Sequence, residues 1–433
     1  MNAITWSDDQ KSALDALQSG RSAFITGGAG TGKSTVTKQF CRGRNIAKLA
    51  TTGAASVLIR GQTVHSFFGM RPQIHVPGSV RDGKVEVSSK ALRRMASFDG
   101  ILIDEVSMLR VDMFQCIIET MGLAKTMRGG KPFQLICVGD FAQLPPVVTE
   151  EERRVLRDMY GSAMFAFEHA AWSALDTHEL SVIHRQSADS DYAKWLAGVR
   201  HGHVPDVNLV NSRVGAAPED SVRLVATNAA AARINDEKMN ALPGRDVILR
   251  GKLRGDFNPS NVRVPEAFPM RRGARVIICK NNKQAGYVNG STGLIMEIGY
   301  SNKGKLLAKI LLDSGKTVQV TEGVWEQISY ERGPTGDYEA KVRGTYTQMP
   351  LLPGWAITIH RSQGMSLDSV HADPQGLFTS GQAYVALSRA TSLEGLTLEN
   401  PVDREDLYPH PKVARYHESL LRGQEAEALP FTL

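Results

Sequence analysis

The sequence has few cysteines, no long apolar run and no strong excess of one charge. Its four cysteines are scattered and form no C-x-x-C pair, which disfavours a disulfide framework or a cysteine-ligated metal cluster and fits a reducing compartment. No apolar stretch approaches the ~18 residues that a membrane-spanning helix needs. The N-terminus lacks the basic and apolar regions of a signal peptide. These absences predict a cytoplasmic protein with no membrane partner.

Low-complexity tracts and internal repeats are also absent, so the composition is that of an ordinary globular protein. The 433 residues are enough for about two to four domains. Hydrophobic residues make up 42% and charged residues 22%, which is usual for globular chains. The formal net charge is +6 and the isoelectric point is about 9.0. This mild basicity permits a polyanionic partner without requiring one.

A glycine-rich stretch near the N-terminus carries the clearest motif. Residues 27–34 read Gly-Gly-Ala-Gly-Thr-Gly-Lys-Ser and match the phosphate-binding loop G-x-x-x-x-G-K-[ST]. An apolar run at 23–26 predicts a buried strand before it, and 34–42 predicts a helix after it. Such a loop turns backbone N–H groups toward phosphate oxygens at a helix N-terminus. The alternative is a chance glycine turn. The expected nucleotide contacts are Gly28, Gly30, Thr31, Gly32, Lys33, Ser34 and Thr35, with the Ser34 hydroxyl on Mg²⁺.

Two acids follow a second apolar run at residues 101–103. Beside the phosphate loop, Asp104 is expected to hold Mg²⁺ and Glu105 to polarise the attacking water. A further strand is expected at 135–140, and Gln143 after it is a candidate sensor of the γ-phosphate. Loop capping is the alternative for Gln143. Gln10, on a helix before the loop, could read the adenine edge, although a solvated glutamine is the commoner case.

The region between these motifs suggests contacts to single-stranded nucleic acid. A strand at 45–51 leads to Thr52 and Gly53, and His65 and Phe67 follow. Small hydroxyl residues beside glycine, then histidine and phenylalanine, suit backbone contact with base stacking. Core packing is the alternative for Phe67. Prolines then interrupt residues 69–93, and an Asp-Gly pair within 80–85 signals a hairpin. We expect a small inserted subdomain here.

After residue 176 the alternation of strands and helices restarts without a second phosphate loop. Strands are expected at 180–185, 222–228 and 355–360, and helices at 229–242 and 381–389. Arg185 and Arg389 end two of these elements. They are either surface arginines or two groups that reach the γ-phosphate across a cleft. Short strands at 276–278, 293–298, 306–312 and 316–320 predict a small inserted β-barrel.

Together these motifs resemble the Pif1 family of superfamily 1B helicases, which has RecD-like relatives. The matching stretches are Gly27 to Ser34, Gly61 to Phe68, Ile103 to Met108, Gly139 to Pro146, Thr358 to Gly364 and Tyr384 to Arg389. Two departures concern fine contacts. Thr51-Thr52-Gly53 stands where Pro-Thr-Gly is more usual, and Ile183-His184-Arg185 stands where Phe-Arg is more usual. The position of Gln10 close to the start of the chain favours a bacterial or phage member.

The resemblance implies an α/β fold with two RecA-like domains and ATP between them. The expected domains are 1–176 with the inserted hairpin subdomain 69–93, and 177–272 with 346–433, into which an SH3-like barrel at 273–345 is inserted. The implied catalytic residues are Lys33, Asp104, Glu105, Gln143, Arg185 and Arg389, with Gln10 and Gly364 as further nucleotide contacts. The implied DNA contacts are Thr52, Gly53, His65, Phe67, Asn228, Thr358, His360 and Ser362.

The implied activity is ATP-dependent unwinding of DNA with 5′→3′ movement, with ATP and Mg²⁺ as cofactors and the 80–85 hairpin as the wedge. A solvated surface loop is the alternative for that hairpin. The alternative activity is a DNA-stimulated translocase or nucleotide switch that does not separate strands. We expect a monomer. The sequence leaves the preferred DNA open among single strands, forks, G-quadruplexes and RNA–DNA hybrids.

Overall fold

The computed structural model describes residues 5–70, 73–78, 80, 87, 89–182, 190–282, 284–300, 306–332, 338–374, 377 and 379–421. The chain divides into two compact units. The first comprises Met1–His184, Gln327–Arg343 and Lys412–Leu433, and the second comprises Arg185–Glu326 and Gly344–Pro411. Among the described residues, no helix combines the length and the apolar character that crossing a membrane would require.

The first unit is built on a six-stranded parallel sheet. Its strand order is β3-β2-β4-β5-β1-β6. The strands are β1 (Ala23–Gly27), β2 (Ile46–Ala50), β3 (Gln62–Thr63), β4 (Gly100–Asp104), β5 (Gln134–Val138) and β6 (Asp176–Leu180). The expected strands at 23–26, 45–51, 101–105 and 135–140 are confirmed. Parallel strands buried on both faces read as continuous apolar runs, which is why these four were visible in the sequence.

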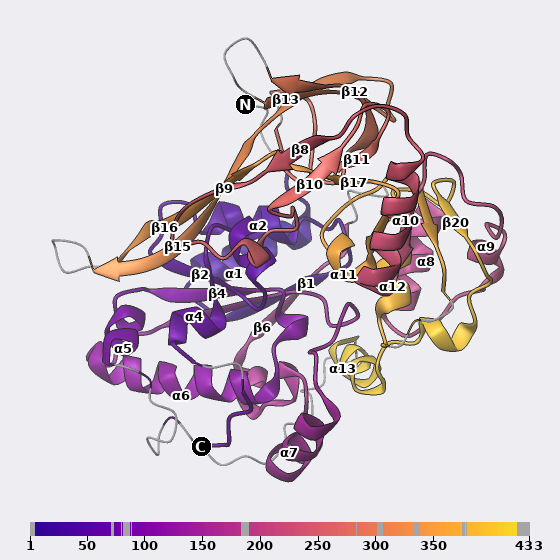
Figure 1. Cartoon of the computed structure of the whole chain (residues 1–433). Coiled ribbons are helices and arrows are strands. Elements are labelled where there is room, and N and C mark those ends of the chain that lie inside the picture. The colour runs from indigo at the N-terminus through magenta and orange to yellow at the C-terminus, as the bar shows by residue number, and fades with distance from the viewer. Residues whose placement is uncertain are drawn as a thin grey trace. The chain divides into compact units, whose positions relative to one another are not determined.

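Helices cover both faces of this sheet (Figure 1). On one face, Leu14 and Leu17 of α1 and Val36 and Phe40 of α2 pack with alternate strand residues such as Ile25. On the other face, α4, α5 and α6 share a core with the intervening strand residues. The helices are α1 (Asp8–Gln18), α2 (Lys33–Phe40), α3 (Gly53–Leu58), α4 (Val64–Phe68), α5 (Ser89–Ala96), α6 (Val111–Met127) and α7 (Glu150–Tyr160).

The last described helix, α13 (Pro411–Leu421), packs in the core of the first unit. Tyr416 stacks on Phe167 at 4.4 Å between ring centroids, and its hydroxyl accepts a hydrogen bond from the indole N–H of Trp172 at 2.9 Å. Lys412 forms an ion pair with Glu168 at 2.6 Å. The sequence predicts residues 346–433 in the second domain, whereas α13 from Lys412 onward belongs to the first unit. The difference arises because this aromatic packing joins residues more than 240 positions apart.

The second unit contains a four-stranded parallel sheet in the order β18-β7-β19-β20. Its strands are β7 (Val222–Val225), β18 (Ala356–Thr358), β19 (Val370–Ala372) and β20 (Leu396–Leu398), and its helices are α8 (Ser190–Arg200), α9 (Asn208–Asn211), α10 (Asn228–Asn240), α11 (Ile359–Ser362) and α12 (Gln382–Leu387). The expected strand at 355–360 is shorter because the Thr358 hydroxyl caps α11 by accepting from the Arg361 N–H at 3.3 Å.

The region expected to form a barrel is rich in antiparallel strands. Five strands pair in the order β14-β13-β12-β11-β17, with β11 (Arg275–Ile278), β12 (Thr292–Tyr300), β13 (Leu306–Leu312), β14 (Thr317–Thr321) and β17 (Leu351–Pro353). A second sheet has the order β15-β16-β9, with β9 (Lys252–Gly255), β15 (Gly323–Arg332) and β16 (Tyr338–Gln348), and β8 (Val247–Arg250) pairs with β10 (Ala267–Met270). The four strands expected between 276 and 320 are all present.

Candidate nucleotide and nucleic-acid sites

The phosphate-binding loop connects β1 to α2 in the way the motif requires. Gly30 and Gly32 adopt φ angles of 84° and 90°, so the loop uses left-handed backbone that glycine adopts without strain. Gly27 has a φ of 145°, and a β-carbon there would lie 2.5 Å from the Leu180 carbonyl oxygen of β6. The loop therefore needs its first glycine for packing as well as for turning.

The Lys33 ammonium group already lies over this loop. It donates hydrogen bonds to the carbonyl oxygens of Gly27 at 2.6 Å and Gly28 at 2.9 Å. Ser34 and Thr35 are exposed in the first turn of α2, and the N-terminus of a helix favours an anion. The sequence-predicted phosphate contacts are thus brought together at one helix N-terminus.

Gln10 lies behind the loop. Its side chain is 3% exposed and donates to the Thr31 carbonyl at 3.0 Å, while its amide oxygen accepts from the Ser7 N–H at 3.2 Å. Thr31 is buried as well, with its hydroxyl donating to the Gly28 carbonyl. These hydrogen bonds to loop carbonyls stabilise the conformation of the phosphate-binding loop. A role of Gln10 in reading adenine stays a prediction.

The two acids stand where β4 ends. Burial raises the pKa of the Asp104 carboxyl, and the N–H of Glu105 and the charge of Lys33 oppose that rise. Glu105 has a φ of 54°, left-handed backbone that costs a non-glycine residue about 1–3 kcal/mol. The Thr51 hydroxyl donates to the Glu105 carbonyl at 2.9 Å and holds this turn. A strained acid that directly follows a partly buried acid near a lysine is an arrangement suited to catalysis.

Gln143 lies in the turn after β5. It is 8% exposed, and its amide group donates to the Asp140 carboxylate at 3.2 Å. Asp140 also accepts from the Ala142 N–H at 3.3 Å. The geometry is that of the loop-capping alternative, and contact of Gln143 with a γ-phosphate stays a prediction.

Arg389 is buried in the second unit, with 1% of its surface exposed. Its guanidinium donates to the Val385 carbonyl at 2.8 Å, the Ser388 hydroxyl at 2.9 Å and the Met365 carbonyl at 3.2 Å. It is therefore not a surface arginine. Arg185 lies outside the described residues, and so does the Asp-Gly turn of the expected hairpin. Gly364 is exposed, with a φ of 77°.

The DNA candidates of the first unit lie on short helices at the sheet's end. Thr52 caps α3 by accepting from the Ala55 N–H, and Gly53 begins that helix. His65 is partly buried on α4; burial lowers its pKa, and the charge of Arg110 lowers it further. Phe67 is a correction. Its ring is fully buried against Phe68 at 5.1 Å between centroids, so it offers no face to a base, and core packing accounts for it.

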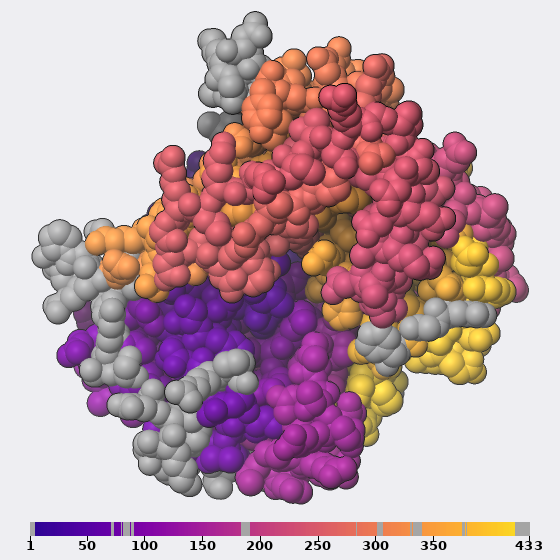
Figure 2. All heavy atoms as spheres, in the orientation of Figure 1, coloured from indigo at the N-terminus to yellow at the C-terminus, as the bar shows by residue number. Residues whose placement is uncertain are grey.

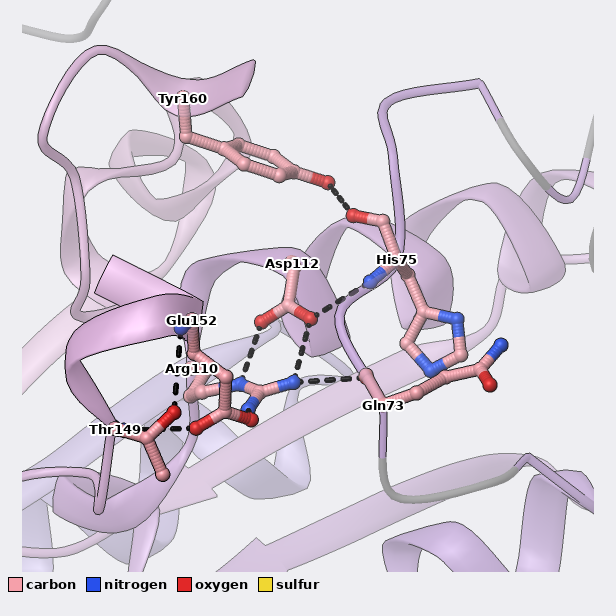
Figure 3. A network of polar contacts seen from close by, with 7 residues as sticks. All are labelled: Gln73, His75, Arg110, Asp112, Thr149, Glu152 and Tyr160. Atoms are coloured by element: carbon pink, nitrogen blue, oxygen red, sulfur yellow. Dashed lines mark hydrogen bonds and ion pairs between the residues drawn. The ribbon is translucent and has the colours of Figure 1, made fainter. Parts of the chain in front are cut away.

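Figure 3 shows a polar network that we call the α6 clamp. Its residues Arg110, His75 and Asp112 act electrostatically on His65. Arg110 forms a two-pronged ion pair with the fully buried Asp112, at 2.9 Å for each bond, and a second ion pair with Glu152 at 2.8 Å. Asp112 accepts from the His75 N–H at 3.0 Å, and the Tyr160 hydroxyl donates to the His75 carbonyl at 2.7 Å. The clamp fixes residues 73–78 to α6 and α7.

The charged groups of the α6 clamp also shift one another's pKa. Burial disfavours the guanidinium charge of Arg110, but Asp112 and Glu152 outweigh burial and raise its pKa. The Thr149 N–H, and then Arg110, lower the pKa of Glu152. Further along α6, Glu119 accepts from the N–H groups of Gly78 at 2.8 Å and Val80 at 3.0 Å. Hydrogen bonds to Asp112 and Glu119 of α6 therefore hold the described chain that precedes residues 81–86.

The DNA candidates of the second unit fall into two groups. Asn228, exposed at the start of α10, and Thr358 line one cavity. His360 is partly buried, and burial lowers its pKa. Ser362 is fully buried, with its hydroxyl donating to the Ile359 carbonyl at 2.8 Å, so a strand cannot reach it in this conformation.

Sequence reasoning missed the α6 clamp and the cavity. An arginine two positions from an acid, such as Arg110 and Asp112, is too common a pattern to single out. The partner of Asp112, His75, is 37 residues away, and the partner of Arg110, Glu152, is 42 residues away. Arg361, which lines the cavity, stood within the matched stretch Thr358 to Gly364 but carried no separate signal.

The chain is similar to known helicases both in sequence and in structure. Residues 5–209 match the family model described as PIF1-like helicase. The chain is 31% identical to the ATP-dependent DNA helicase Pif1 of Bdellovibrio bacteriovorus, over 96% of this chain and 92% of that protein. Its structure is similar to that of a Bacteroides Pif1 in complex with ADP-AlF4, with a TM-score of 0.88 and 24% identity over 99% of this chain and all of that one. It is also similar to Bacteroides Pif1 bound to single-stranded DNA, with a TM-score of 0.65 and 25% identity over 99% of this chain and all of that one.

Proposed function

Since this chain belongs to the PIF1-like helicase family, we propose that it is an ATP-dependent DNA helicase that moves 5′→3′ on a single strand and separates duplex ahead of it. The observation that carries the proposal is the set formed by Lys33, Asp104 and Glu105. A lysine over a glycine loop, a partly buried acid and a strained acid would supply phosphate binding, metal binding and water activation within one unit.

ATP binding rests on the loop and on α2. The Lys33 ammonium, which bonds two loop carbonyls, is placed to exchange them for phosphate oxygens, where its charge is stabilised more strongly. The residues fit a bound Mg²⁺, because Asp104 and the exposed Ser34 hydroxyl offer the oxygen ligands that this ion prefers. Mg²⁺ would neutralise charge on the β- and γ-phosphates.

Hydrolysis needs a base that orients water toward the γ-phosphate. Glu105 is assigned this role because it directly follows Asp104, the assigned Mg²⁺ ligand, at the end of β4. Gln143 and Arg389 are assigned to sensing and stabilising the phosphate, and Arg185 to the same task. Movement follows if nucleotide binding and release change the separation of two DNA-holding surfaces, one carrying Thr52 and His65 and the other carrying Asn228 and Thr358.

The alternative, a nucleotide switch that does not separate strands, is less well supported because the full-length relative from Bdellovibrio is named a DNA helicase. Direction comes from the family resemblance rather than from residue chemistry. Action as a monomer, and activity on forks, G-quadruplexes or RNA–DNA hybrids, belongs to the same proposal.

The test combines ATP turnover with strand separation. Single-stranded DNA should stimulate turnover many-fold, and a duplex with a 5′ single-stranded tail should be unwound while one with a 3′ tail is not. Lys33→Ala serves as the inactive control. Turnover that ignores DNA would contradict the proposal. Stimulated turnover without unwinding of either duplex would leave the switch alternative, and unwinding from the 3′ tail would reverse the direction.

A further inference from the structure

The second unit contains a cavity of about 210 Å³ between α10 and the strands β10, β17 and β18. Figure 2 shows the surface hollowed between α10 and the β8–β10 region. Most of its wall is apolar, made by Met239, Pro265, Phe268, Pro269, Leu352 and Pro353. Two of the prolines, Pro265 and Pro269, are exposed, so part of this apolar wall faces solvent. An open apolar wall of this kind is suited to a flat ring.

Two hydrogen bonds join neighbouring elements of the cavity wall. The Asn235 amide group donates to the Ala356 carbonyl at 2.8 Å and accepts from the Ala356 N–H at 2.9 Å, which joins α10 to β18. Asn235 is therefore occupied in holding the cavity's shape. These two hydrogen bonds hold together α10 and β18, two of the elements that line the cavity.

The chemistry of the lining favours a base over a phosphate. A phosphate inside would lose its hydration against apolar walls and meet the carboxylate of Asp236, which also lines the cavity. A planar ring suits the space, because an apolar cavity of about 150 Å³ is enough to hold benzene. Arg361 is exposed and lines the same cavity. Its guanidinium can pair with a backbone phosphate while the attached base enters.

We infer that this cavity takes one nucleobase of the bound single strand, with Pro265 and Phe268 against the ring and Arg361 on the adjoining phosphate. The inference rests on the proposed function and deepens it. Asn228 and Thr358, both expected DNA contacts, line the same cavity, so the strand would pass its mouth. The base adds affinity that depends on stacking and not on charge.

The test uses Ala232, an exposed residue of α10 that lines the cavity. Ala232→Phe places a ring in the cavity, and Ala232→Ser is the matched control that leaves it open. Binding is measured with a fluorescent single-stranded DNA and with an abasic strand of the same length. Ala232→Phe should weaken binding to the ordinary strand by about five-fold or more, the equivalent of the ~1 kcal/mol at the low end for one stacked base.

Binding of Ala232→Phe to the abasic strand should equal that of Ala232→Ser, and the salt dependence should not change, because the phosphate contacts remain. Equal weakening on both strands, or no weakening on either, would overturn the inference. Ala232→Leu gives a smaller blockage if the phenylalanine variant does not fold. Failure of the proposed function is distinguishable, since the wild-type protein would then show no DNA-stimulated ATP turnover at all.

Discussion

Truncation of Arg389 to alanine removes a buried guanidinium and tests two roles at once. In the folded protein this group donates to the Val385 and Met365 carbonyls and to the Ser388 hydroxyl. After truncation the Val385 carbonyl still accepts from the Ser388 hydroxyl at 3.1 Å. The Met365 carbonyl loses its guanidinium donor. The structural cost therefore comes mainly from this one acceptor and from lost packing.

The magnitude follows from these two losses. A buried acceptor left without a donor costs about 1–3 kcal/mol. The two methylene groups beyond the β-carbon contribute about 0.8 kcal/mol each. We expect the free energy of unfolding of Arg389→Ala to fall by about 3–5 kcal/mol. Arg389→Met keeps the apolar stem and should lose only about 1–3 kcal/mol.

The catalytic role predicts a separate effect. If Arg389 stabilises the phosphate in the transition state, both variants should lose about 10³-fold or more in ATP turnover while nucleotide binding persists. Arg389→Lys should not restore turnover, because lysine lacks the planar fork of donors. Stability is measured by urea unfolding, and turnover at a temperature where each variant is folded. An unchanged stability would refute the hydrogen-bond argument, and normal turnover in folded Arg389→Met would make Arg389 a structural residue.

Three further predictions concern separate parts of the molecule. Lys33→Ala should abolish turnover by weakening ATP binding, whereas Glu105→Gln should abolish turnover but still bind ATP; loss of nucleotide binding in Glu105→Gln would count against a water-activating role. The logarithm of DNA affinity should fall with the logarithm of salt by about 0.7 for each phosphate contacted. That slope should change little between pH 7 and pH 8, because burial lowers the pKa of His65 and of His360 and so favours their neutral forms; a steeper slope at pH 7 would show a charged histidine in the interface. Tyr160→Phe should lower the free energy of unfolding by about 1–3 kcal/mol, because it leaves a carbonyl of the α6 clamp without its hydroxyl donor; a urea midpoint equal to that of the wild type would contradict this.

The nucleotide site was predictable because its signals are local. Strand β1, the glycine loop and α2 are continuous in the chain, and each has its own pattern of apolar or glycine residues. The antiparallel strands β11 to β14 were visible for the same reason, since short apolar runs alternate with turn residues. The acids Asp104 and Glu105 were found from their position at a strand end.

Features that depend on distant partners were not predictable. Strand β6 was expected at 180–185 but lies at Asp176–Leu180, and four of its five residues are only partly buried. Its sequence, Asp-Thr-His-Glu-Leu, lacks an apolar run because, among the described strands, it lies at the edge of the sheet and pairs only with β1. The packing of α13 and the α6 clamp likewise depend on contacts between residues far apart in the chain.

The packing of Gly27 affects what its presence indicates in a relative that has lost ATPase activity. Any β-carbon at this position would collide with the backbone of β6, whether or not a nucleotide ever binds. A descendant that had lost its ATPase activity would therefore be selected to keep this glycine merely to fold. Retention of the first motif glycine is thus weak evidence for catalysis in such a descendant. Retention of Lys33 and Glu105 is stronger evidence, because an ammonium group over the loop and a strained acid have no comparable packing reason to persist.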